Sequence, residues 1–301
     1  MKLIALLVLS GAMASAQLPA PCASGALPQL PAPLQPGARV VPLWPAGSPV
    51  LRGCDQREVF TPTKSDPSRV QKVVNIHNPS IELHLAGKPN GLAMIAAAGG
   101  GNTELNVGTE GTDIAKWLND LGVSVFILRY RLKPYGSDTD ALADTQRSIR
   151  MVRAHTKEWG VDPARIGIMG FSAGGEQAAR AVLTFDAGNP TATDPVERES
   201  SRPDVAVLVY AGWGKLDMSN VPKNAPPTFL TSAGIDDAFH ARETVEFYTA
   251  LSNAQIPVEL HIYGHGGHAN GIQPRNGIPF GTWHHRFEEW IADLGMMKAT
   301  L

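Results

Sequence analysis

Short apolar runs alternate with amphipathic segments along most of this 301-residue chain. The apolar runs lack the polar–apolar alternation of a half-exposed strand. This lack of alternation is typical of strands that are buried on both faces of a parallel sheet. Residues 70–76 and 81–85 look instead like antiparallel strands at a sheet edge. The buried runs are residues 92–98, 123–130, 166–169, 205–210, 228–232 and 258–262.

Apolar residues at helical spacing separate the predicted strands. The stripes are Ile114, Trp117, Leu118 and Leu121; then Leu142, Ile149 and Val152; then Trp283, Phe287, Trp290, Ile291 and Leu294. The aromatic residues of the last stripe are predicted to be core. Strands alternating with helices predict one α/β domain, with a mostly parallel central sheet and helices on both faces.

The first 69 residues are predicted to lie outside this domain, which we assign to residues 70–301. Residues 1–16 combine a positive start, an apolar stretch and an A-x-A-like end, as a secretory signal peptide does. A buried N-terminal helix is the alternative. Residues 17–69 are rich in proline and are predicted to form an extended arm on the domain surface. The mature protein is therefore expected to be secreted or periplasmic, without a membrane segment.

The only two cysteines of the chain, Cys22 and Cys54, both fall in this arm. An exported protein meets oxidising conditions, so a disulfide between them is predicted to tie the arm to the domain. Two unpaired thiols are the alternative.

Composition excludes some classes of partner. The chain is 43% hydrophobic and 18% charged, with a formal net charge of -2, which is ordinary for a packed globular protein. That charge gives no global attraction to nucleic acid or to anionic membranes. A small or neutral substrate is therefore expected.

The segment Gly170-Phe171-Ser172-Ala173-Gly174 is a G-x-S-x-G sequence between a predicted buried strand and a predicted helix. This is the context of a nucleophile elbow, in which a sharp strand-to-helix turn lifts the serine hydroxyl above the sheet. The turn also leaves the backbone N–H of Ala173 free to bind an anion.

A nucleophilic serine needs a base and an acid that orients it, and in this arrangement they follow Ser172 in the order acid, then base. Asp236 and Asp237 come after one predicted strand, and His265 and His268 come after the next. His268 is favoured as the base because two glycines precede it and it lies farther from the strand end; His265 would line the pocket. The residues alone leave Asp236 and Asp237 open.

The glycine run in A-G-G-G-N, residues 98–102, supplies the second part of an oxyanion hole. Glycines let backbone N–H groups approach a substrate oxygen closely, and Gly100 or Gly101 is the expected donor. A nucleotide-phosphate loop is disfavoured, because no P-loop lysine follows and position 104 is Glu rather than Gly.

No metal or organic cofactor is predicted, because the histidines outside the two loops show no reliable metal-ligand spacing. These are His77, His84, His155, His240, His261, His284 and His285.

Residues from about 40 to 295 resemble the exported bacterial α/β-hydrolase esterases related to acetyl-xylan and feruloyl esterases, often grouped with dienelactone-hydrolase-like proteins. The resemblance implies that Ser172 is the nucleophile, His268 the base and Asp236 the acid. Proline is missing before the glycine run, and Ala238-Phe239-His240 stands where valine-proline is usual. The matching stretches are VPLWPAGSP, AAAGGGNTELNVGTEGTDIAKWLNDLGVSVFILRYRL, WGVDPARIGIMGFSAGG, PPTFLTSAGIDD and VELHIYGHGGHANG.

The expected function is a serine carboxylesterase that hydrolyses short-chain acyl esters, including acetylated carbohydrate, through an acyl-enzyme. The loop between Tyr210 and residue 228 is too short for a large helical lid. A prolyl-oligopeptidase-like peptidase is the first alternative, although residues 17–69 are too short for its usual propeller. A non-catalytic binding protein on a hydrolase fold is the second, although such a protein would be expected to lack a triad member.

Overall fold

The computed structural model describes residues 17–23, 28–269, 271–275 and 277–297, so the predicted signal peptide lies outside the described residues. The strands are β1 (Arg39–Pro42), β2 (Val59–Pro62), β3 (Val70–Val74), β4 (Ser80–His84), β5 (Ala93–Ala97), β6 (Ser124–Arg129), β7 (Ile166–Phe171), β8 (Val205–Val209), β9 (Thr228–Ala233) and β10 (Val258–Tyr263). The α-helices are α1 (Asp113–Asp120), α2 (Asp140–Ala154), α3 (Thr156–Trp159), α4 (Ala173–Thr184), α5 (Ala238–Asn253) and α6 (Trp283–Asp293). A π-helix η1 (Gly108–Thr112) and two 3-10 helices, η2 (Pro195–Arg198) and η3 (Pro279–Thr282), complete the elements.

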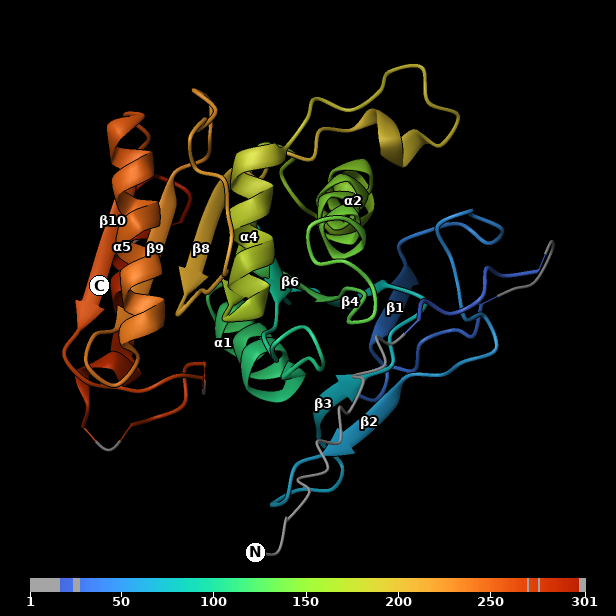
Figure 1. Cartoon of the computed structure of the whole chain (residues 1–301), viewed down its shortest axis with the longest axis horizontal. Coiled ribbons are helices and arrows are strands. Elements are labelled where there is room, and N and C mark those ends of the chain that lie inside the picture. The colour runs from blue at the N-terminus through green and yellow to red at the C-terminus, as the bar shows by residue number, and fades with distance from the viewer. Residues whose placement is uncertain (1–16, 24–27, 270, 276, 298–301) are drawn as a thin grey trace, which may run out of the picture.

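An eight-stranded sheet in the order β1-β4-β6-β5-β7-β8-β9-β10 forms the centre of the fold (Figure 1). The pairs from β6 to β10 are parallel, and β1 and β4 are antiparallel additions at one edge. Every residue of β5 through β9 is buried, as the apolar runs predict. The predicted, mostly parallel central sheet is confirmed.

Helices cover both faces of this sheet. The connections that carry α2, α4 and α5 all step along the sheet toward β10, so right-handed crossovers place these helices on one face. In Figure 1, α4 and α5 lie in front of the strands. The β5–α1–β6 connection steps the opposite way, which places α1 on the other face. There Trp117 of α1 packs edge-on against Trp283 and Phe287 of α6.

The arm, residues 17–69, is more than a surface segment, which corrects the sequence expectation. Residues Arg39–Pro42 form β1 and pair antiparallel with β4, so the arm supplies an edge strand of the main sheet. Strand β2 pairs with β3 in a separate two-stranded sheet, so residues 70–76 are not an edge strand of the main sheet. Each arm strand has only four residues and ends with a proline, so neither produces a visible strand period.

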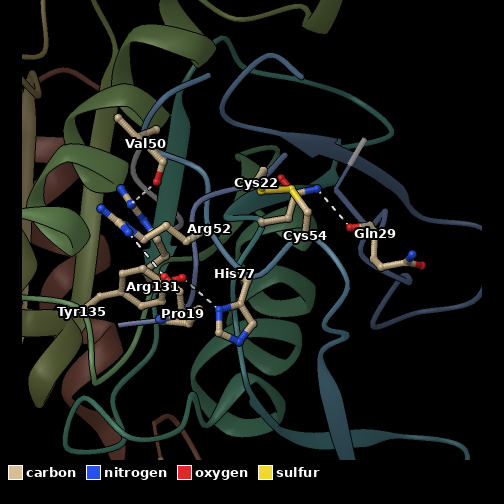
Figure 2. The surroundings of a disulfide bond; sticks show 10 residues. Pro19, Cys22, Gln29, Val50, Arg52, Cys54, His77, Arg131 and Tyr135 are labelled. Atoms are coloured by element: carbon tan, nitrogen blue, oxygen red, sulfur yellow. Dashed lines mark hydrogen bonds between the residues drawn. A yellow bond between two sulfur atoms is a disulfide. The ribbon is translucent and has the colours of Figure 1, made fainter. Parts of the chain in front are cut away.

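A disulfide joins Cys22 to Cys54 within the arm, with their Cα atoms 5.4 Å apart. Figure 2 shows the bridge beside Gln29, whose backbone N–H donates to the carbonyl of Cys54 over 3.3 Å. Arg131, just beyond β6, donates from Nη1 to the carbonyl of Val50 over 3.0 Å. The bridged part of the arm is therefore attached to the α/β domain by polar contacts as well as by strand pairing.

No helix within the described ranges is both long enough and apolar enough to cross a bilayer.

Candidate active site

Ser172 occupies the turn between β7 and α4 with φ 51° and ψ −119°, a conformation that L-residues rarely adopt. The flanking glycines make this turn feasible. A Cβ at Gly170 would collide with the carbonyl oxygen of Gly174, and a Cβ at Gly174 would collide with that of Ala97 at the end of β5. The elbow predicted from G-x-S-x-G therefore exists, and its tight packing presents the serine beyond the carboxyl end of the sheet.

His268 faces this serine from the loop after β10. Its Nε2 lies 2.8 Å from Ser172 Oγ, and its Nδ1 lies 2.8 Å from Oδ2 of Asp237. A carboxylate only accepts hydrogen bonds, so the Nδ1–H of His268 donates to Asp237, and Nε2 keeps a lone pair that faces the serine hydroxyl. The three side chains form a continuous chain of hydrogen bonds in the geometry of a serine nucleophile with its base and acid.

Asp236 does not contact His268, which corrects the choice of Asp236 as the partner of that histidine. Its carboxylate accepts a 2.8 Å hydrogen bond from the Gly266 backbone N–H and faces Nδ1 of His265 at 3.1 Å. These bonds hold the pKa of Asp236 below its ordinary value. Asp236 belongs to the exposed turn after β9, whereas Asp237 immediately precedes α5 and is buried. Two neighbouring carboxylates therefore face opposite surroundings.

His240 is a site residue that sequence reasoning missed. It lies in the first turn of α5, and its Nδ1 is hydrogen-bonded to Oδ1 of Asp237, while its ring stacks on His268 with centroids 4.0 Å apart. Both oxygens of Asp237 thus face an imidazole. The available signal was the spacing Asp237-x-x-His240, since residues three apart share a helix face.

Asp237, His240 and His268 also offer ligand atoms that all lie within 4.8 Å of one another. Carboxylate oxygen and imidazole nitrogen are donors that zinc accepts, and the expectation of no metal spacing did not foresee this cluster. The hydrogen bonds just described already pair these three side chains with one another and with Ser172, so we assign them to that hydrogen-bonded chain rather than to a metal.

The glycine run and Ala173 both lie next to Ser172. A Cβ at Gly99 would lie 2.7 Å from Cβ of Ser172, so this loop packs directly on Ser172. Gly100 and Gly101 have φ of 141° and 62°, which favour glycine. Ala173 is the first residue of α4, where an N–H has no carbonyl of its own helix to bond. Within the described residues no protein hydrogen bond uses the N–H groups of Gly100, Gly101 or Ala173.

The segment between β8 and β9 contains no helix, in agreement with the predicted absence of a large lid in these described residues. Its backbone runs beside the serine, since the Gly212 N–H lies 3.5 Å from the carbonyl of Ser172. The next residues line a cavity of about 540 Å³, whose walls include Trp213, Leu216 and Met218 and also Glu243 of α5.

Residues 94–251, more than half of the chain, match a family profile described as alpha/beta hydrolase fold. The chain belongs to this family, and the predicted fold class and resemblance are confirmed.

Two relatives indicate the chemistry found in this family. An acetylxylan esterase of Xylanibacter ruminicola is 29% identical over 267 residues, covering 78% of this chain and 49% of that protein. A probable carboxylic ester hydrolase, LipM, of Mycobacterium tuberculosis is 32% identical over 132 residues, covering 44% of this chain and 30% of that protein. The chain spans about half the length, or less, of these curated relatives.

Solved structures give the same picture of the fold. An acetyl ester-xyloside bifunctional hydrolase from Caldicellulosiruptor lactoaceticus superposes with a TM-score of 0.72 at 29% identity, covering 91% of this chain and all of that one. Esterase 2 of Thermogutta terrifontis superposes with a TM-score of 0.63 at 19% identity, covering 88% of this chain and 95% of that one. The latter likeness supports the fold alone.

Proposed function

We propose that this protein is a serine carboxylesterase with Ser172 as nucleophile, His268 as base and Asp237 as the orienting acid. The observation that carries the proposal is the unbroken pair of 2.8 Å hydrogen bonds from Asp237 through His268 to Ser172. The esterase names of the relatives support the same class of reaction.

The geometry suggests a two-step hydrolysis. Ser172 Oγ attacks the ester carbonyl while His268 Nε2 takes the serine proton, and the oxyanion accepts hydrogen bonds from the N–H groups of Ala173 and of Gly100 or Gly101. Collapse breaks the bond to the alcohol, which leaves with the proton from His268. Water then attacks the acyl-enzyme with the same base and releases the acid and Ser172.

We propose short acyl esters as the substrate class, with acetyl groups on carbohydrate as the natural candidates. The acetylxylan esterase relative and the acetyl ester-xyloside hydrolase neighbour support this choice. The lack of a helix between β8 and β9 in the described structure supports it further, since an uncovered site accepts a bulky alcohol such as a sugar.

We also propose that the protein acts outside the cytoplasm, in the periplasm or after secretion. The signal-peptide pattern of residues 1–16 carries this proposal. A bridge between Cys22 and Cys54 is compatible with an oxidising compartment. Expression in a bacterial host with residues 1–16 present should yield periplasmic protein that begins near Gln17, as read by N-terminal sequencing.

The decisive experiment compares wild type with Ser172→Ala on p-nitrophenyl esters of graded acyl length, acetylated xylan and matched amides. Wild type should prefer the short esters, and Ser172→Ala should lose several orders of magnitude in kcat with an unchanged melting temperature. A folded Ser172→Ala variant with near-normal turnover would refute the nucleophile. Preference for the amides would favour the peptidase alternative, and inactivity of wild type on every substrate would favour a binding protein.

A further inference from the structure

Glu110 is a buried carboxyl group that the proposed hydrolysis does not use. It lies in the π-helix η1, which follows the glycine run, and only 1% of its surface is exposed. A buried carboxylate is costly unless hydrogen bonds satisfy it. The partners of Glu110 therefore indicate why the fold keeps it there.

Both oxygens of Glu110 bind groups next to the active site. Oε2 accepts a 2.8 Å hydrogen bond from the N–H of Gly99, the residue that packs on Ser172. Oε1 lies 2.8 Å from the hydroxyl of Tyr210, which follows β8. Glu110 thus links the glycine run to a second loop at the carboxyl end of the sheet.

Tyr210 continues the link to the base. Its hydroxyl accepts a 2.9 Å hydrogen bond from the N–H of Gly271, three residues beyond His268, and its ring packs edge-on to that imidazole with centroids 5.0 Å apart. Tyr210 itself is completely buried and has φ 38°, an uncommon value for a non-glycine residue. The surrounding structure must hold this conformation in place.

The directions of these hydrogen bonds are determined. The N–H groups of Gly99 and Gly271 can only donate, so the hydroxyl of Tyr210 accepts from Gly271 and donates its own proton to Glu110. This pattern fits an ionised carboxylate that accepts on both oxygens. Burial raises the pKa of Glu110, and its hydrogen bonds with Gly99 and Tyr210 oppose that rise.

We infer that Glu110 and Tyr210 are positioning residues of the esterase, a buried pair that holds the glycine run and the His268 loop at fixed places around Ser172. The inference rests on the proposed function. Neither side chain reaches the substrate in this scheme. They act by keeping the oxyanion donors and the base in place before the reaction begins, where small displacements are expensive.

The test replaces each member of the pair with its closest uncharged or hydroxyl-free analogue. Glu110→Gln places an amide N–H₂ or a weaker acceptor against groups that need a carboxylate, and Tyr210→Phe leaves Gly271 N–H and Glu110 Oε1 without partners. Each variant is expected to lose about 10- to 100-fold in kcat with KM within about threefold of wild type, because displaced donors weaken transition-state binding more than ground-state binding. The double variant should be no slower than the slower single variant, since the two residues act as one unit.

Two matched controls separate positioning from general destabilisation. Glu82→Gln changes another fully buried glutamate that accepts from a backbone N–H, that of Leu34, far from the serine in sequence and strand order. Tyr135→Phe removes another buried hydroxyl, one that is hydrogen-bonded to His77 beneath the arm (Figure 2). Both controls should lower the melting temperature, with kcat within about twofold of wild type.

All values of kcat are normalised to the number of serines labelled by an organophosphate, so unfolded protein does not count. Single losses confined to kcat, no further loss in the double variant and unaffected controls would support the inference. Normal kcat in both single variants, losses equal to those of the controls, or multiplying losses in the double variant would overturn it. If Glu110→Gln does not fold, the Tyr210→Phe comparison with Tyr135→Phe decides alone. Failure of the proposed function is distinguishable, because it shows as an active Ser172→Ala variant or an inactive wild type, whereas failure of this inference leaves wild type active and Ser172→Ala inactive.

Discussion

The loops after β9 and β10 form two aspartate–histidine pairs side by side, and the pairs differ in solvent exposure. In the inner pair the side chains of Asp237 and His268 are 8% and 34% exposed, with 2.8 Å between oxygen and nitrogen. In the outer pair those of Asp236 and His265 are 39% and 65% exposed, at 3.1 Å. Exposed ion pairs of this kind contribute little to the free energy of unfolding, because water and salt screen the interaction between the two charges.

The difference shows that residue type alone does not make a pair functional. Asp237 is buried and contacts imidazoles on both oxygens, which restricts the orientation of His268. Asp236 instead ties two turns together through the Gly266 N–H. We assign chemistry to the inner pair and local loop structure to the outer pair, and four measurements test this division.

The largest contrast is expected between the two histidines. His268→Ala should lower kcat by about 10⁴-fold or more, close to the loss in Ser172→Ala, because members of such a triad act as a unit. His265→Ala should stay within about fivefold of wild type, since an exposed side chain at the outer pair does not touch Ser172. Steady-state kinetics on one short-chain ester checks both. A larger loss in His265→Ala would reverse the assignment of the loops.

The aspartates should differ almost as much. Asp237→Asn should cost about 10³- to 10⁴-fold in kcat, because the amide can donate to Nδ1 and stabilise the imidazole tautomer that cannot take the serine proton. Asp236→Asn should cost less than about tenfold. Equal losses in the two variants would show that the inner and outer pairs are not functionally distinct.

His240 should have an intermediate effect. His240→Ala removes the hydrogen bond to Oδ1 of Asp237 and the stacking on His268, while the bond between those two residues remains. We expect kcat to fall about 10- to 100-fold, in line with one lost hydrogen bond to a charged group. The same kinetic assay measures it. A loss as large as that of Asp237→Asn would make His240 indispensable to the inner pair.

The smallest effect concerns the stability of the outer pair. The folded-state pKa of Asp236 is lowered by hydrogen bonds from Gly266 and His265, so its ionised form stabilises the fold above the ordinary aspartate pKa near 3.8. That contribution is lost as pH falls through the lowered folded pKa. Asp236→Asn should therefore melt about 1 °C below wild type at pH 7, and the gap should narrow as the pH falls below the ordinary aspartate pKa. Calorimetry at pH 7 and at about pH 3 tests this, and a gap that widens in acid would contradict it.

Sequence patterns locate the elements at the carboxyl edge of the sheet but not the orientation of each loop side chain. Ser172 and His268 are predictable because an elbow motif and a glycine-rich loop follow buried strands, whose ends meet at one edge. The choice between Asp236 and Asp237 cannot be predicted from the sequence, because it depends on the residue at which α5 begins. A one-residue shift there turns a carboxylate from the imidazole to the solvent.

The burial of Glu110 and the strands of the arm are not predictable from the sequence for a different reason. The segment Gly108–Thr112 consists of Gly-Thr-Glu-Gly-Thr, which has the composition of an exposed helix start, yet Glu110 is buried by packing from distant strands. Strand β1 lies in a proline-rich region whose local preferences point to extended chain, and only pairing with β4 defines it as a strand. Both features depend on contacts far apart in the sequence.

Strand β1 also covers an edge of the main sheet that could otherwise pair with a strand of another molecule. Without it, the backbone N–H and C=O groups along one side of β4 would face water as an open template for strand addition. Release of the residues before Leu43 needs both a protease cut and reduction of the Cys22–Cys54 bridge, and it would therefore promote self-association. The proline after Val41 ends β1 where its own outer side is exposed, and a chain stacking there finds no amide proton to bind at Pro42.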